Sequence, residues 1–255
     1  MDIFDVLIIS IIGFLAGIIN VMAGGGSLLT MPLLIFLGLD SVTANGTNRV
    51  AIFFQNISSI HGFRSKGVKV GIYGVYLGVA ALLGAIVGSK MAIQIDHQVF
   101  NRILAVVMIL VVVMTLINPA LKSTEKLAEG YFTERITGKY KFLGIFAMFF
   151  VGIYGGFIQA GSGLFIMAAL TFINRFTLLK SNAAKAVITL IYTLSALSVF
   201  ILDGKVEWLY GLTLAVSMSI GAWLTSRWSS GSGEKYIKYF MIVAVIAMAI
   251  KLWFY

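Results

Sequence analysis

The sequence contains no cysteine, which excludes disulfides, thiolate nucleophiles and sulfur-ligated metal sites and leaves the redox compartment open. Charge is also scarce: 11% of the 255 residues are charged, whereas a soluble domain typically carries about 25%. The two histidines, His61 and His97, are far apart in the chain and form no metal-binding pattern. We therefore expect neither a bound metal nor a cofactor.

Apolar sequence takes the place of charge. Apolar residues make up 60% of the chain, mean hydropathy is +0.99, and residues 103–121 and 142–174 contain no charged group. A helix needs roughly 20 apolar residues to cross the hydrocarbon core of a bilayer. These features predict an all-α, polytopic membrane protein with almost no soluble domain. The first run follows the acidic residues Asp2 and Asp5 rather than a basic signal region, so we expect it to be retained as a helix.

The apolar runs predict two halves, residues 1–121 and 142–255, joined by the polar linker 122–141. In the first half a run over 4–39 is broken at Gly24, Gly25 and Gly26, and in the second a run over 142–174 is broken at Gly161, Ser162 and Gly163. The remaining helices are expected at about 45–63, 70–90, 102–121, 182–202, 208–227 and 236–255.

The two halves match without gaps when the sequence is shifted by 137 positions. The shift places Asn45 on Asn182, Ser58 on Ser195, Tyr73-Gly74 on Tyr210-Gly211, and Gly84-Ala85 on Gly221-Ala222. Chance matching among abundant Gly and Ala is the alternative, but Asn and Tyr-Gly in the same register favour a true internal repeat.

Loop charges predict the orientation. The loops around Lys66 and Arg175, the linker, and the loop over 227–238 hold 13 of the 19 Lys and Arg residues. The positive-inside rule places these loops in the cytoplasm and both termini outside, and it explains the net charge of +9 without a nucleic-acid partner. The repeats are then inverted, a recurring plan among transporters with a site at the midplane. With two glycine-broken helical hairpins, we expect eight to ten transmembrane segments.

Each glycine turn precedes an apolar arm too short to cross a membrane, and a break in a membrane helix is tolerated only within protein or beside a cavity. The free N–H groups and positive dipole at the start of each arm favour anions. We therefore expect both turns to lie close together and face one cavity near mid-membrane. The residues proposed there to bind substrate are Gly24, Gly25, Gly26, Ser27, Gly161, Ser162 and Gly163. The competing interpretation is close helix packing by small residues.

Polar residues follow each turn at helical spacing. Asn45, Asn48 and Gln55 share one face, with Arg49 beside it, and Asn182, Lys185 and Tyr192 form the corresponding face in the second half. Polar groups inside a membrane normally point inward and carry function. Two alternatives stay open: Arg49 reaching the external interface and Lys185 reaching the cytoplasmic one.

No carboxylate lies inside a predicted span, because all ten acidic residues fall at the N-terminus, in loops or at span ends. Cation carriers and proton pumps usually need a carboxylate there. The interior instead offers amides, hydroxyls, cations and helix N-termini, and this favours an anionic substrate.

Essentially the whole chain resembles a known family, and the most specific motifs lie in the first half. Gly13-Phe14-Leu15-Ala16-Gly17, Gly24-Gly25-Gly26-Ser27, Pro32 and Ala44-Asn45-Gly46-Thr47-Asn48 are similar to the sulfite exporter TauE/SafE family, also called toluene sulfonate uptake permeases. The resemblance implies a duplicated protein of the bacterial or archaeal inner membrane that moves sulfite, sulfoacetate or other sulfonates, most often outward. The second half departs from the pattern, since Gly161-Ser162-Gly163 lacks the triple glycine and Ala169 stands where Pro32 would match.

We therefore expect a secondary transporter, most simply an exporter, that moves small sulfur-containing anions by alternating access. A passive anion channel is the nearest alternative. A membrane-embedded enzyme is disfavoured because interior acids, cysteines and clustered histidines are lacking. Substrate, direction, coupling ion and oligomeric state do not follow from the sequence.

Overall fold

The computed structural model describes residues 1–117, 133–228 and 234–254. Over these residues the chain forms α-helices and no strand, which confirms the predicted all-α class. The helices are α1 (Ile3–Ala23), α2 (Ser27–Phe36), α3 (Ser41–Ser65), α4 (Ile72–Ala92), α5 (His97–Ile117), α7 (Gly138–Phe157), α8 (Ser162–Phe172), α9 (Leu178–Leu202), α10 (Trp208–Trp228) and α11 (Glu234–Trp253).

Six helices within the described part of the chain are long and apolar enough to cross a membrane: α1, α4, α5, α7, α9 and α10. The short α2 and α8 are the second arms of the two broken runs, as expected from the glycine turns. The 25-residue α3 is long enough to span but carries many polar side chains, which are buried inside the bundle. Residues 118–132 of the predicted linker lie outside the described residues, and α7 already begins at Gly138, before the linker's expected end.

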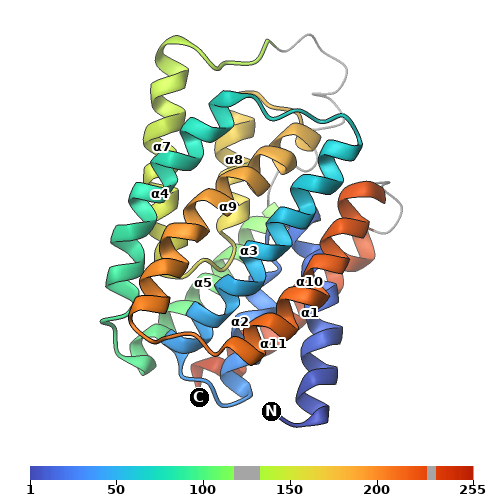
Figure 1. Cartoon of the computed structure of the whole chain (residues 1–255), viewed down its shortest axis with the longest axis vertical. Helices are drawn as coiled ribbons and strands as arrows, with labels where there is room; N and C mark the ends of the chain where they lie inside the picture. Colours follow the sequence, from blue (N-terminus) through green and yellow to red (C-terminus); the bar gives the residue numbers. More distant parts are fainter. Residues whose placement is uncertain (118–132, 229–233, 255) are drawn as a thin grey trace.

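Helices of the two halves interpack (Figure 1). α4 packs against α7 and α9, whereas α10 packs against α1 and α3. Glycine permits the close approach of α4 and α7: a Cβ on Gly84 would lie 2.0 Å from the carbonyl oxygen of Phe149, and one on Gly88 would lie 1.9 Å from that of Ile153. Small residues at helix crossings let backbones touch in this way.

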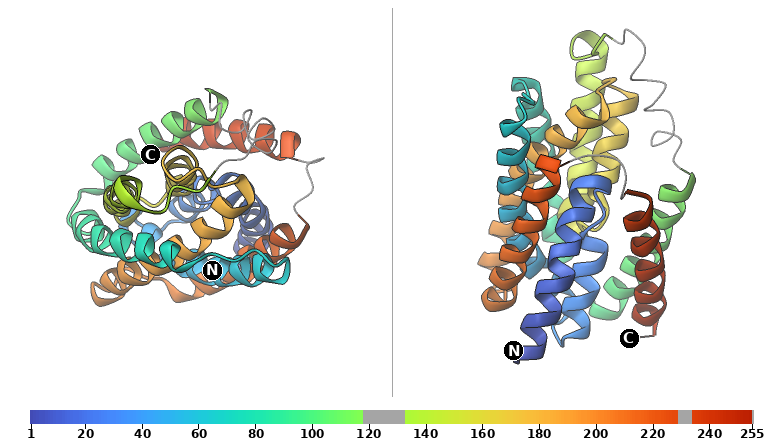
Figure 2. Two further views of the ribbon diagram at one scale, coloured as in Figure 1. Left: turned by 90° about the horizontal axis from the view of Figure 1, so that it is seen from above. Right: turned by 90° about the vertical axis from the view of Figure 1, so that its right-hand side faces the viewer.

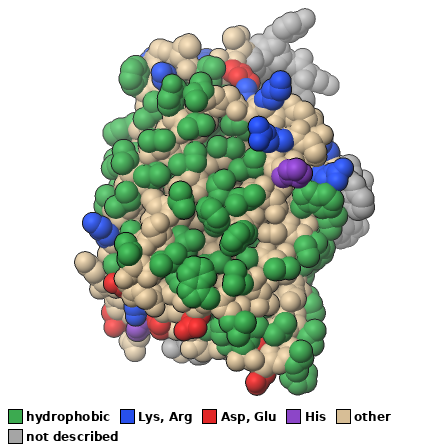
Figure 3. Space-filling model, viewed as in Figure 1, with side chains coloured by type: hydrophobic (Ala, Val, Ile, Leu, Met, Phe, Trp, Pro, Cys, Tyr) green, Lys and Arg blue, Asp and Glu red, His purple; other side chains and the backbone are tan. Residues whose placement is uncertain are grey.

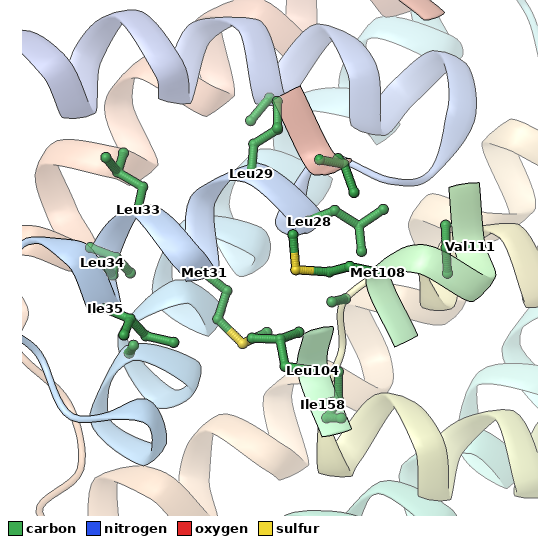
Figure 4. Packing of buried hydrophobic residues seen from close by; sticks show 14 of the residues in the cluster. Leu28, Leu29, Met31, Leu33, Leu34, Ile35, Leu104, Met108, Val111 and Ile158 are labelled. Carbon is green, nitrogen blue, oxygen red and sulfur yellow. The ribbon is translucent and has the colours of Figure 1, made fainter. Parts of the chain in front are cut away.

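α5 and α11 form a separate pair at the edge of the bundle (Figure 2). Between this pair and the rest lies α2, whose residues Ser27–Ile35 are all buried. Its Leu28, Met31 and neighbouring side chains pack with Leu104, Met108 and Val111 of α5 and with Ile158 after α7 (Figure 4). Tertiary packing therefore holds a ten-residue helix that would be marginal alone.

The helix boundaries repeat along the chain. α3 and α9 both contain 25 residues, and both their first and their last residues are separated by 137 positions. Both begin earlier than the apolar pattern predicted because polar residues cap them. The Asp40 carboxylate accepts hydrogen bonds from the N–H groups of Val42 and Thr43, and the Thr177 hydroxyl accepts one from Lys180.

Charges separate along the bundle axis (Figure 3). Acidic side chains gather at the end that carries both termini, and most Lys and Arg side chains gather at the opposite end. At the acidic end, partial burial works to raise the pKa of the Asp40 carboxyl, but hydrogen bonds from Thr43 and the charge of Lys205 lower it below its usual value. Large apolar side chains cover the outer surface between the two ends, including Ile72, Leu83 and Phe146.

Candidate functional site

The two glycine turns meet backbone to backbone. Gly24 ends α1 and Gly161 precedes α8, and both adopt the left-handed conformation with φ of +72°. A Cβ added to Gly24 would lie 2.7 Å from the carbonyl carbon of Gly163, and one added to Gly163 would lie 2.7 Å from the Cα of Gly24. The expectation that the turns lie close together is confirmed, and neither contact residue can carry a side chain without moving the other.

Two helix N-termini start at this contact. α2 begins at Ser27 and α8 at Ser162, each directly after its turn. The first N–H groups of a helix have no partner within the helix, and the dipole there is positive. Gly25 lies in the first of these turns and is packed against side chains: a Cβ at that position would lie 3.2 Å from Leu28 and 3.3 Å from Met241, both of which would have to shift slightly. The convergence of two such termini favours a negative ligand.

The last turn of α1 is closed by Lys185 of α9. The Lys185 ammonium donates to the backbone carbonyl of Asn20 at 2.8 Å, to that of Val21 at 3.1 Å, and to the Asn182 side-chain oxygen at 2.8 Å. These acceptors match the three donors of an ammonium group. Lys185 is 5% exposed, so it is held inside the protein rather than reaching the cytoplasmic interface.

The last turn of α7 is closed by Arg49 of α3. Its guanidinium donates to the carbonyls of Gly155 and Gly156 at 3.1 and 2.6 Å, and to the Gln159 side-chain oxygen at 2.8 Å. It also donates to Asn45 at 3.1 Å, while the Asn45 amide donates to the Phe157 carbonyl at 2.7 Å. Arg49 is fully buried, so the alternative in which it reaches the external interface is wrong.

The two cations thus occupy the negative ends of α1 and α7, where cations are favoured. The positive N-termini of α2 and α8 remain, and neither Lys185 nor Arg49 can neutralise them. This arrangement strengthens the preference of the turn region for an anion.

Asn48 directly precedes Arg49 on α3 and is fully buried. Its side-chain oxygen accepts a hydrogen bond from Thr30 of α2 at 2.6 Å, but its buried amide nitrogen has no partner. The Arg49 Nε is also buried without a partner. A buried donor left without an acceptor costs about 1–3 kcal/mol. Both donors would gain an acceptor from a bound anion or water.

The other predicted residues line the same region. Gln55 accepts a hydrogen bond from the Asn20 amide at 2.5 Å and donates to Ser59 at 3.3 Å. The Tyr192 hydroxyl lies 2.7 Å from the Ser162 hydroxyl at the start of α8. Helix α9 therefore contacts both turns, at Asn20 through Lys185 and at Ser162 through Tyr192.

Sequence reasoning missed three residues of this network: Asn20, Thr30 and Gln159. Asn20 and Gln159 both lie within an apolar run just before a turn, and Gln159 has a positive φ of 66°. A polar residue in such a position is itself a signal of a buried network. Thr30 gave no comparable signal, because a single threonine in an apolar helix commonly bonds to its own backbone.

Over the described residues, a helical bundle with six helices long and apolar enough to cross a membrane and with an apolar outer surface indicates a multi-pass membrane protein. The model of the sulfite exporter TauE/SafE family matches residues 9–252, nearly the whole chain, and the chain belongs to this family.

Similar curated proteins are named as probable membrane transporters. A probable membrane transporter protein, ORF9, from Sinorhizobium sp is 26% identical over 94% of this chain and 88% of its own length. A probable membrane transporter protein of Haemophilus influenzae is 26% identical over 94% and 91%. The probable membrane transporter protein YfcA of Escherichia coli K12 is 27% identical over 94% and 87%. No solved structure matches the chain.

Proposed function

We propose that this protein is a secondary transporter, most simply an exporter, for small sulfur-containing anions such as sulfite, sulfoacetate or other sulfonates. The observation that carries the proposal is the contact between the two turns, where two helix N-termini meet beside the unpartnered amide of Asn48. Substrate identity within this class follows from the family resemblance and not from the geometry.

The donors match the ligand. A sulfite or sulfonate group presents three oxygens, each of which accepts hydrogen bonds. The proposed donors are the backbone amides of Gly25–Ser27, Gly161 and Gly163 together with the Asn48 side chain. The amides of Gly24 and Ser162 already donate to the carbonyls of Asn20 and Gln159. Asn45, Asn182, Gln55, Tyr192, Arg49 and Lys185 would frame this site and add positive potential. Among the side chains that the structure describes, no Asp or Glu is buried in the bundle, where it would repel the anion.

Two observations support an arrangement of two inverted repeats, residues 1–121 and 142–255 joined by 122–141. The boundaries of α3 and α9 match, and α4 and α10 each pack against helices of the other half. In this proposal the broken hairpins bring the count to eight to ten membrane segments, and alternating access moves one half against the other about the turns. The basic end faces the cytoplasm and both termini face outward across the inner membrane.

Asn48→Asp tests the site. The change keeps the side-chain shape and the oxygen that accepts from Thr30, but replaces the unpartnered donor with an acidic oxygen. Asn56→Asp is the matched control, because Asn56 lies on the same helix, is equally buried, and donates only to the carbonyl of Ile52. We expect sulfite and sulfoacetate uptake into proteoliposomes to fall at least tenfold more in Asn48→Asp than in the control. Equal losses would remove Asn48 from the site.

Two further measurements test mechanism and orientation. Saturable counterflow of labelled sulfoacetate is expected of a carrier, whereas a passive channel would show none. Because the chain has no cysteine, Asp2→Cys and Lys66→Cys provide unique labelling positions at opposite ends. An impermeant maleimide added to intact cells should label the first and not the second. The reverse pattern would overturn the proposed orientation.

A further inference from the structure

An apolar groove of about 930 Å³ runs along the outer surface between α4 and α7. Its walls include Ala80 and Leu83 from α4 and Phe142, Leu143 and Phe146 from α7. Leu83 is 55%, Phe142 71% and Phe146 63% exposed. These large side chains border the groove without filling it.

The groove follows from how the two helices cross. They touch through glycine at the level of Gly84 and Gly88, where no side chain fits between them. Nearer the start of α7, its phenylalanines stand outward while α4 contributes the small Ala80, which leaves space between the helices.

The groove opens at the basic end of the molecule. Lys139 and Tyr140 form part of its lining. The Arg135 guanidinium lies 4.3 Å and the Lys139 ammonium 5.4 Å from the centre of the Tyr140 ring. Lys141 lies 5.2 Å from the ring of Tyr76 on α4. Cations from the start of α7 and the residues before it thus lie near the mouth, beside the rings of Tyr140 on α7 and Tyr76 on α4.

These cations have no acidic partner in the part of the chain that the structure describes. Its ion pairs join Lys180 to Glu134 and His97 to Asp40. Glu134, the acidic residue next to Arg135 in sequence, is thus bound to Lys180 at 2.6 Å. The mouth of the groove carries positive charge that an anion can neutralise.

We infer that this groove binds an anionic phospholipid, with an acyl chain along the apolar walls and the phosphate group at Lys139 and Arg135. Basic residues beside an apolar surface at a membrane interface select anionic headgroups. Aromatic rings such as Tyr140 suit the same depth, where one side is apolar and the other is wet. The charge also argues against a second copy of this chain as the occupant. A two-fold dimer about the membrane normal would bring two identical basic clusters to the same level, where they repel.

The test uses the full chain reconstituted in vesicles of equal parts phosphatidylglycerol and phosphatidylcholine, then extracted gently for native mass spectrometry. Wild type should retain phosphatidylglycerol in preference to phosphatidylcholine. The double variant Arg135→Gln/Lys139→Gln should weaken that preference by about fivefold for each charge removed. The control Lys66→Gln/Lys69→Gln removes two exposed lysines at the same end of the molecule, outside the groove lining, and should keep the preference.

A third variant probes the apolar walls. Ala80→Phe fills the groove from α4 and should reduce retention of both lipids, because it removes the space for the acyl chain. Equal retention of the two lipids by wild type, or an unchanged preference in the double variant, would overturn the assignment. So would efficient disulfide cross-linking of a Phe146→Cys variant into dimers in the membrane, since this would show that a second copy covers the groove.

Discussion

The two broken hairpins differ in the side chains that bind the carbonyl groups at their interrupted helix ends. At each break a helix ends inside an apolar bundle, and its last carbonyls have no partner within the helix. At the end of α1 a single lysine from the other half supplies the donors, and Gly24 closes the turn. At the end of α7 an arginine and an asparagine from the other half supply them, and Gln159 enters the network with its own side chain.

The difference shows how the two ends are constrained. The α7 end is tied by more hydrogen bonds, because a guanidinium presents five N–H donors and an ammonium presents three. The α1 end depends more on backbone conformation, because the left-handed Gly24 packs directly on Gly163. In both cases the donor comes from the opposite half, so each half completes the other's helix ends.

Arg49→Met should have the largest effect. It keeps an apolar stem but leaves the carbonyls of Gly155 and Gly156 and the Gln159 oxygen without the donors they have now. Each buried acceptor left unsatisfied costs about 1–3 kcal/mol, so the total should be about 4 kcal/mol or more. Thermal unfolding in detergent measures this loss. A melting temperature within a few degrees of wild type would contradict the role assigned to Arg49.

Gly24→Ala should follow, with a loss of about 2–4 kcal/mol from left-handed strain and overpacking. Gly161→Ala is the matched control because its φ is the same. There the added Cβ meets only the side chain of Val111, which can move, whereas at Gly24 it meets the backbone of Gly163. Equal losses in the two variants would mean that the contact between the turns does not matter.

Lys185→Ala should lower the free energy of unfolding by about 2 kcal/mol. This loss is smaller than that of Arg49→Met, because the Asn20 carbonyl keeps the hydrogen bond that it accepts from Gly24. If Lys185 also attracts substrate, anion affinity should fall about tenfold or more, and Lys185→Arg should recover part of it. Loss of stability with unchanged affinity would limit Lys185 to closing the end of α1.

Lys180→Ala should have the smallest effect, although it lies only five residues from Lys185 on the same helix. Its ion pair with Glu134 is partly exposed to water. Such pairs contribute about 0–1 kcal/mol. A loss as large as that of Lys185→Ala would show that position on α9, rather than burial, sets the cost.

The sequence predicted the features that depend on local pattern. The apolar runs indicated the helices, and the glycine turns indicated their breaks at 24 and 161. The spacing of Asn45, Asn48 and Lys185 placed them on inward faces. The distant partners of Asn45, Arg49 and Lys185 could not be predicted, because they are backbone carbonyls more than 100 positions away. Arg49 illustrates this: its burial depends on the carbonyls of Gly155 and Gly156 in the last turn of α7, and no local pattern pairs that turn with α3.

The central claim is that a small oxyanion binds where α2 and α8 begin. Crystals of the protein grown with selenite, a heavier analogue of sulfite, test it directly through the anomalous signal of selenium. The account predicts one strong selenium peak beside the Gly24–Gly163 contact, within hydrogen-bond reach of the Asn48 amide and absent in Asn48→Asp. A selenium site elsewhere in the bundle, or an unchanged peak in Asn48→Asp, would contradict it.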